Sequence, residues 1–404
     1  MSRHQIEFGD EILDLDLGEE SFLGAFKAPP GMMGTEPEAA LRGVLERPRG
    51  YPPLRQNVVP GDRVAIALGR DVPDPDLVVR VIADVLAGAG VEAESITVVE
   101  PSGRVGPEVR PTPGGAVERH DPSLQDRIAY LATTQGGSRI YLNRTLTDAD
   151  VVVPVGVVRF DPLDGPQGPW SVLFPDMSDQ ATRETRRRTG AKASPAAQPG
   201  RQPDPEDVEV GALLGAHFQI GLVPGSRGPV EFLAGRIEDV RDAGLAALER
   251  DWTFRPGGRA ELVVAGIGGE GEATGLHELV AGLATAGRLV QRGGRIVALS
   301  RAVGDLGPSL QRLRAAGDGA AAVQALRGHE DDPDHRIARV LAHVLDWADV
   351  YLLSGLDPEA VEDLAIIPLE RPEEAKRLAS RASTCLLVDR ADRVRVEPPP
   401  GDDA

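Results

Sequence analysis

The stretch ADVVVPVGVVRFDPLDGPQGPWSVLFPD, residues 149–176, joins a run of apolar residues to a loop rich in glycine and proline. The apolar run, 149–158, is typical of a parallel strand that is buried on both faces. In open α/β sheets, ligands bind at the carboxyl ends of the strands, which is where this loop lies. The loop therefore has the position of an active site. Its polar or amphipathic side chains are few: Asp161, Asp164, Gln167, Trp170 and Ser171.

Apolar runs alternate with segments of helical periodicity on both sides of this stretch. The other expected strands are 62–68, 95–100, 217–223, 260–269, 293–300, 348–356 and 383–389. The expected helices are 74–91, 237–252, 275–290, 338–347 and 372–382. Because nearly continuous apolar strands alternate with helices, the sequence predicts an α/β fold with mainly parallel sheets that helices cover on both faces.

A chain of 404 residues is too long for one ordinary core, and its alternation of strands and helices begins again at 260–269. We therefore expect two α/β domains, 1–252 and 253–391, with a cleft between them and a tail rich in proline and aspartate over 392–404. The polar segment 178–207 is expected to be a mobile or partly disordered loop.

The composition narrows the possible partners and the location. A net charge of −19 disfavours nucleic acid and anionic membrane surfaces, because both attract basic proteins. No run is apolar for the roughly 18 residues of a membrane span, and the acidic start of the chain is unlike a signal peptide. A cytoplasmic location is expected. The single cysteine, Cys385, excludes an internal disulfide, and nothing in the composition indicates an oligomeric state.

The order of several short segments resembles the lactate racemase family that carries a nickel-pincer nucleotide, the LarA-like proteins. The likeness extends from about residue 5 to about residue 390. The segments that carry it are ALRGVLERPRGYPPLRQNVVPGDRVAIAL (40–68), LNRTLTDADVVV (142–153), EFLAGR (231–236), IGGEGEATGLHE (267–278), RGGRIVALS (292–300) and VYLLSGL (350–356). The resemblance implies two α/β domains, an interdomain cleft and racemisation of a 2-hydroxy acid.

Three residues are the candidates for acid–base chemistry. By the resemblance, Asp161 stands in place of a metal-binding histidine, Asp204 in place of a catalytic histidine and His277 in place of a tyrosine. A histidine and a carboxylate on opposite faces of a carbon atom can exchange its proton, one acting as acid and the other as base. An exposed carboxylate near its ordinary pKa is, however, a weak base toward an unactivated C–H bond.

The loop after the strand 149–158 is the candidate for ligand binding. Gly165 and Gly168 match glycines of the family, but Trp170 or Ser171 stands at the lysine that tethers the nickel-pincer nucleotide. Neither side chain can form that covalent bond. We therefore expect no cofactor and no metal.

Two functions fit these residues. The first is a LarA-like protein without the nickel-pincer reaction, whose cleft binds a small carboxylate through Arg70 and Arg104, which lie at strand ends that face the cleft in the family. The alternative is an active racemase or epimerase of a 2-hydroxy acid that uses Asp161, Asp204 and His277 in a remodelled site. The replaced residues favour the first.

Overall fold

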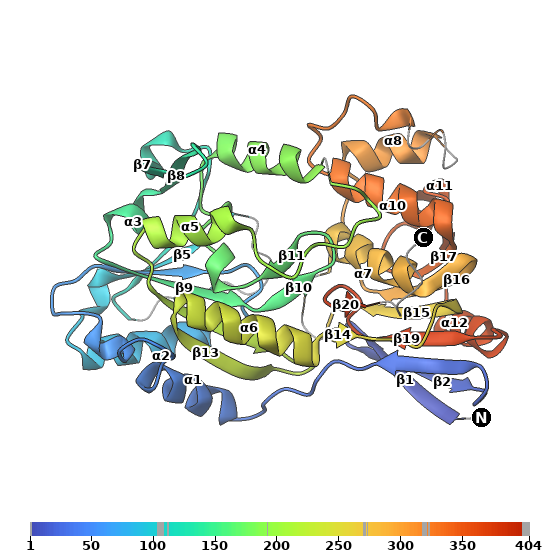
Figure 1. The fold of residues 1–404 in the computed structure, drawn as a ribbon, viewed down its shortest axis with the longest axis horizontal. Helices are drawn as coiled ribbons and strands as arrows, with labels where there is room; N and C mark the ends of the chain where they lie inside the picture. Colours follow the sequence, from blue (N-terminus) through green and yellow to red (C-terminus); the bar gives the residue numbers. More distant parts are fainter. Residues whose placement is uncertain are drawn as a thin grey trace.

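The computed structural model describes residues 2–102, 109–110, 113–191, 193–269, 272, 274–316, 321 and 324–397. Figure 1 shows two lobes, and each is built on its own six-stranded sheet. Among the described residues, no helix has the length and apolar character needed to cross a membrane. The predicted α/β class with mainly parallel sheets is confirmed.

The first lobe has the strand order β13-β12-β9-β4-β5-β6. Its strands are β4 (Val64–Leu68), β5 (Ile96–Glu100), β6 (Ala116–Arg119), β9 (Val151–Val157), β12 (Phe218–Pro224) and β13 (Pro229–Arg236). Only the pair β12–β13 is antiparallel. The helices around it are α1 (Glu36–Glu46), α2 (Pro75–Gly88), α3 (Arg144–Asp148) and α6 (Ile237–Asp251). A hairpin, β7 (Ile128–Thr133) and β8 (Arg139–Asn143), extends this lobe.

The second lobe has the strand order β18-β17-β16-β15-β19-β3, and all its pairs are parallel. Its strands are β3 (Phe22–Phe26), β15 (Ala260–Ile267), β16 (Val290–Ser300), β17 (Asp349–Leu353), β18 (Ile367–Pro368) and β19 (Cys385–Val388). Its helices are α7 (Leu276–Leu289), α8 (Pro308–Ala316), α10 (His335–Trp347), α11 (Pro358–Asp363) and α12 (Pro372–Ser380).

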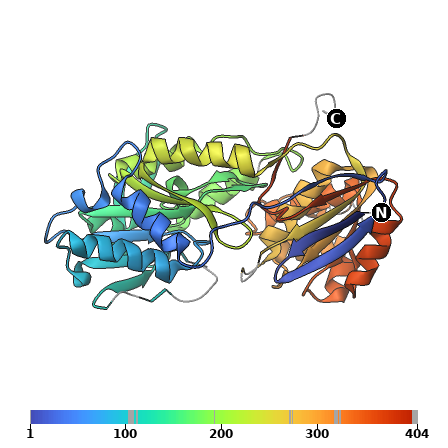
Figure 2. The same ribbon diagram turned by 90° about the horizontal axis from the view of Figure 1, so that it is seen from below.

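The beginning of the chain belongs to the second lobe, so the expectation that 1–252 form one domain is wrong for its first residues. Strand β3 pairs with β19, and the hairpin of β1 (Ser2–Phe8) and β2 (Glu11–Leu17) packs on the same sheet (Figure 2). Alternate residues of the hairpin form an apolar face that needs a partner. The alternation predicts strands, but it does not indicate which sheet they cover.

The expected tail also begins too early. Residues Arg395–Val396 form strand β20, which pairs in parallel with β14 (Thr253–Phe254). Val394 and Val396 are buried in the core. The chain is therefore packed as far as residue 397, and residues 398–404 lie outside the described part.

The polar segment 178–207 contains structure where a mobile loop was expected. Its first part is helix α4 (Gln180–Ala191), and helix α5 (Pro205–Leu213) begins at its end. Between the helices the chain crosses to the second lobe, where the Gln198 side chain donates to the carbonyl of Val396 and accepts from its amide (Figure 1). Ion pairs rather than an apolar face hold α4, which is why apolar periodicity gives no signal for it.

One apolar core spans the junction of the two lobes. Val158, Phe160 and Trp170 of the first lobe belong to the same cluster as Val263 and Leu279 of the second. Each lobe also has a buried cluster of its own, so this shared core joins two lobes that are separately packed.

We predict that Phe26→Ala lowers the free energy of unfolding by about 3–4 kcal/mol, because removing a buried aromatic ring leaves a cavity. The Phe26 ring lies 5.9 Å from that of Trp252 and 6.1 Å from that of Phe254. Leu23→Ala, on the same strand but with 42% of Leu23 exposed, should change it by less than about 0.5 kcal/mol. Urea denaturation measures both. Equally small effects would show that β3 is not part of the shared core.

Candidate functional site

The loop after β9 folds into a short hairpin whose turn is held by one aspartate. Strands β10 (Arg159–Asp161) and β11 (Gly165–Gln167) pair antiparallel. In the turn, Oδ1 of Asp161 accepts hydrogen bonds from the amides of Leu163, at 2.8 Å, and Asp164, at 3.0 Å. Gly165 has φ +91°, which favours glycine, so the sequence DPLDG fits this turn. The turn fixes the direction of the Asp161 carboxylate.

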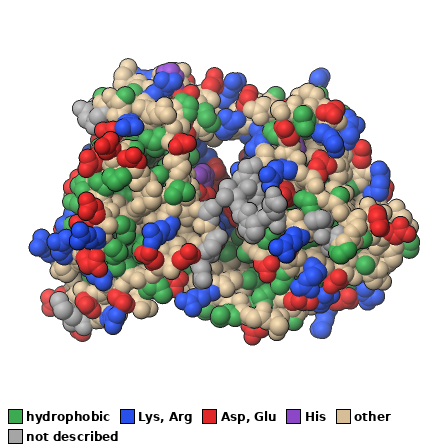
Figure 3. All heavy atoms as spheres, turned by 180° about the vertical axis from the view of Figure 1, so that it is seen from behind, with side chains coloured by type: hydrophobic (Ala, Val, Ile, Leu, Met, Phe, Trp, Pro, Cys, Tyr) green, Lys and Arg blue, Asp and Glu red, His purple; other side chains and the backbone are tan. Residues whose placement is uncertain are grey.

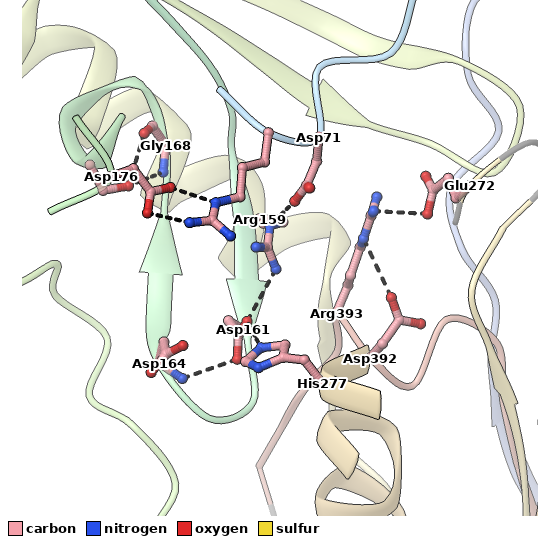
Figure 4. Close-up of polar contacts among 12 residues, drawn as sticks. Asp71, Arg159, Asp161, Asp164, Gly168, Asp176, Glu272, His277, Asp392 and Arg393 are labelled. Carbon is pink, nitrogen blue, oxygen red and sulfur yellow. Dashed lines mark hydrogen bonds and ion pairs between the residues drawn. The ribbon is translucent and has the colours of Figure 1, made fainter. Parts of the chain in front are cut away.

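Asp161 contacts His277 across the junction of the two lobes. His277 is the second residue of α7, and its Nε2 lies 2.8 Å from Oδ2 of Asp161 (Figure 4). The side chain of Asp161 is 3% exposed and that of His277 is 35% exposed. Two of the three predicted acid–base residues are therefore brought together, and they bind each other.

The environment favours the charged forms of both groups. Burial lowers the pKa of His277, but the charge and hydrogen bond of Asp161 outweigh it and raise that pKa to about 9. Burial raises the pKa of Asp161, but the charges of His277 and Arg159 bring it well below its usual range. At neutral pH the pair is an imidazolium and a carboxylate.

Arg159 extends this ion pair toward the end of β4. It lies between Asp71, at 2.9 Å, and Asp161, at 3.2 Å (Figure 4). Burial lowers the pKa of Arg159, but the two carboxylates raise it above its ordinary value. Sequence reasoning missed Arg159 and Asp71. A signal existed, because Arg159 and Asp161 are two residues apart on a strand and so share a face.

A second charged cluster follows β19, in the segment that was expected to be a tail. Glu272 accepts from Arg393 at 2.8 Å, and Asp392 lies 3.5 Å from Arg393 (Figure 4). Glu272 also accepts from Arg390 at 2.6 Å, and Asp392 accepts from the amide of Gly268 at 3.0 Å. Arg393 also helps to lower the pKa of Asp71, which burial alone would raise. The signal that could have found this cluster is a charged run directly after a buried parallel strand.

The two candidate tether positions have structural roles. Trp170 is fully buried, and a Cβ added to Gly168 would lie 2.4 Å from its indole ring. A Cβ on Gly244 of α6 would lie 3.2 Å from the same ring. The hydroxyl of Ser171 accepts from the amide of Gly168 at 3.1 Å and donates to its carbonyl at 3.0 Å. Both glycines therefore make room for a tryptophan that packs in the core.

Asp204, the third predicted acid–base residue, has other partners than the Asp161–His277 pair. Its Oδ1 accepts from the amide of Glu206 at 2.9 Å at the start of α5, and its Oδ2 lies 2.7 Å from Arg186 of α4. These contacts cap one helix and hold the other against it.

Of the two predicted anion contacts, Arg70 already has a carboxylate partner. The Nε and Nη2 atoms of Arg70 donate to the carboxylate of Asp176, at 2.8 and 2.7 Å. Arg183 of α4, which lies in the segment that was expected to be a mobile loop, donates to the hydroxyl of Ser102 at 2.5 Å. Burial lowers the pKa of Arg183; the charge of Asp176 opposes this effect, and the charge of Arg70 adds to it. Two arginines therefore lie near each other at the ends of β4 and β5, while Arg104 lies outside the described residues.

Asp161, Asp164 and His277 have ligand atoms within 4.8 Å of one another, a spacing that could hold a metal ion. The charge of each of these three side chains is already neutralised by a partner of opposite charge. Asp161 pairs with His277 and Arg159, and Asp164 pairs with Arg336. A metal would have to displace the proton of His277 and compete with both arginines. The geometry is that of an ion-pair network.

The network lies at a groove. Figure 3 shows the surface hollowed between the lobes, with histidine and acidic side chains on the wall. The groove is the place where a ligand could reach the exposed part of the site.

We predict that the stability of the protein falls as the pH rises through about 9. A pKa raised from 6.5 to about 9 means that the folded state favours the protonated imidazole. The stabilisation that the His277–Asp161 ion pair contributes is therefore fully present below pH 6.5 and is lost above pH about 9. The facing carboxylates are Asp161, Asp164 and Glu278. Because His277 is partly exposed, we expect a loss of about 1–2 kcal/mol, measured by urea denaturation between pH about 6.5 and about 9.5. In His277→Gln this loss should disappear. An unchanged pH profile in that variant would contradict the ion pair.

Residues 8–186 match the family model of the lactate racemase N-terminal domain. No curated protein matches the chain. Among solved structures, the lactate racemase apoprotein from Thermoanaerobacterium thermosaccharolyticum is similar with a TM-score of 0.80 and 18% identity, over 98% of this chain and 100% of that one. A structural-genomics protein from Thermotoga maritima is similar with a TM-score of 0.66 and 13% identity, over 90% of this chain and 98% of that one.

At these identities the solved structures show a common fold, which extends over nearly the whole chain. The family model adds the sequence relationship for the first part. The chain is therefore similar to lactate racemase in sequence over residues 8–186 and in fold over nearly its whole length.

Proposed function

We propose that this LarA-like protein does not racemise lactate by the nickel-pincer reaction and that its interlobe groove binds a small carboxylate. The contact of 2.8 Å between Asp161 and His277 carries the proposal. Inversion by proton transfer needs an acid and a base on opposite faces of the carbon atom. These two groups instead neutralise each other at one point, and Asp204 is engaged with Arg186.

The residues at the tether positions do not fit the cofactor of the family. That nucleotide would supply nickel and a hydride acceptor, and it needs a lysine in the loop after β9. Here Trp170 is a core residue and Ser171 closes a turn on Gly168. We derive no step that passes through this group.

Arg70 and Arg183 are the proposed carboxylate contacts. Arg70 uses Nε and Nη2 for Asp176, so its Nη1 remains available for a ligand. Among the described residues, Arg183 forms no ion pair, and its hydrogen bond goes to Ser102. A carboxylate between the two guanidinium groups would offset the repulsion that lowers the pKa of Arg183.

One observation favours the alternative, an active racemase or epimerase. A histidine held by a buried aspartate is the pairing found in many general acid–base sites, and the side chain of His277 is 35% exposed at the junction of the lobes. Its raised pKa makes it a proton donor rather than a base at neutral pH. Activity that depends on His277 would establish this alternative.

We expect saturating lactate or pyruvate to raise the melting temperature by about 2–4 °C, because a ligand that binds only the folded state stabilises it. Arg183→Met should remove at least half of the shift. Arg188→Met is the control, because Arg188 is on the same helix but pairs with Asp331. Equal shifts in both variants would exclude Arg183 as a contact.

The same protein should leave L-lactate unchanged in chiral chromatography, with or without added nickel, and its intact mass should show no nucleotide adduct. An adduct on any lysine would contradict the proposal for the cofactor. Interconversion of the lactate enantiomers that is lost in His277→Gln would contradict the proposal for the reaction.

A further inference from the structure

A second basic site lies in the part of the second lobe that faces α4. It is a small, partly open pocket between α7, α10 and two segments of the first lobe, the turn after β10 and the chain after α4. The residues that matter here are Leu163, Ser194, Ala197, Arg288, Arg336 and Arg339. None of them belongs to the proposed carboxylate site at Arg70 and Arg183.

Arg288, in the last turn of α7, differs from the other residues of the pocket in its unpartnered buried N–H groups. Its Nη2 donates to the carbonyl of Ala197 at 3.2 Å, but its buried Nε and Nη1 atoms have no hydrogen-bond partner among the described residues. No carboxylate in the described part of the chain forms an ion pair with it. Buried N–H groups of a cation that lack acceptors are costly, and a folded protein normally satisfies them. The pocket therefore lacks an acceptor that Arg288 needs.

The surroundings are positive although the chain as a whole carries a net charge of −19. Burial and, after it, the charge of Arg395 lower the pKa of Arg288 to about 10. On α10, burial lowers the pKa of His343, with Asp346 opposing and the charge of Arg288 adding to the effect. Arg336 forms an ion pair with Asp164 and also donates a hydrogen bond to the carbonyl of Leu163. The described carboxylates thus leave excess positive charge at Arg288.

We propose that this pocket binds a small oxyanion, such as phosphate, that accepts hydrogen bonds from the unpartnered N–H groups of Arg288. The enclosed part of the pocket has about the size of one water molecule, so it admits one oxygen of the anion. Arg339 and Ser194 line the same pocket and add a positive charge and a hydroxyl group. Because the chain after α4 comes from the first lobe, a bound anion would connect the two lobes.

The test is a thermal titration with sodium phosphate against sodium chloride at equal ionic strength. The wild-type protein should melt about 2 °C or more higher in phosphate. Arg288→Met should abolish this shift and should melt higher than wild type in phosphate-free buffer, because it removes an unsatisfied buried charge. Arg381→Met is the control, since Arg381 is exposed and lies outside the pocket.

Three outcomes would overturn the proposal: an unchanged phosphate shift in Arg288→Met, a lower melting temperature of that variant without phosphate, or loss of the shift in Arg183→Met alone. The last result would place phosphate in the carboxylate site at Arg183. The experiment therefore distinguishes failure of the proposed phosphate pocket from failure of the proposed carboxylate site. If Arg288→Met does not fold, Arg339→Met takes its place. Isothermal titration calorimetry should then show about tenfold weaker phosphate binding, and unchanged binding would overturn the proposal.

Discussion

The ion pair between Asp161 and His277 is the interaction on which the organisation of the site depends. Each partner is placed by its own lobe: the hairpin turn directs Asp161, and the first turn of α7 presents His277. Neither charge would be stable alone in this environment, because burial opposes the charged form of both groups. Arg159 and Asp71 extend this ion pair to the end of β4. Alternating positive and negative side chains therefore connect the first lobe to the start of α7 in the second.

The tryptophan in the loop after β9 also constrains the site, because it packs in the core. In the family a reactive lysine lies in this loop, whereas here Trp170 turns inward and is packed against Gly168 and Gly244. A loop that contributes its largest side chain to the core has little freedom to close over a ligand. Packed aromatic residues thus lie on one side of the hairpin after β9, and the ion pair of Asp161 with His277 lies on the other.

Much of the fold follows from the sequence because it depends on local periodicity. The apolar run that became β9 and the helical pattern that became α7 are both readable residue by residue. The errors concern long-range pairing: β3 joins β19, and β20 joins β14, although more than 100 residues separate the two strands of each pair. Resemblance to the family named Asp161, His277 and Asp204, and the structure brings only the first two together. The position of Arg159 beside Asp161 on one strand and the charged run after β19 are local signals, but the pairing of Arg159 with Asp71 and of Arg393 with Glu272 is between residues remote in sequence, which no local pattern predicts.

The protonation state of His277 reports the ion pair with Asp161 directly. The protein labelled with ¹³C-histidine can be titrated by NMR, and the signal that disappears in His277→Gln identifies the residue. We expect a pKa of about 9, with the imidazole charged at neutral pH. A titration near the ordinary value of about 6.5 would show that Asp161 does not hold the proton on His277. The two lobes would then not be joined by this ion pair.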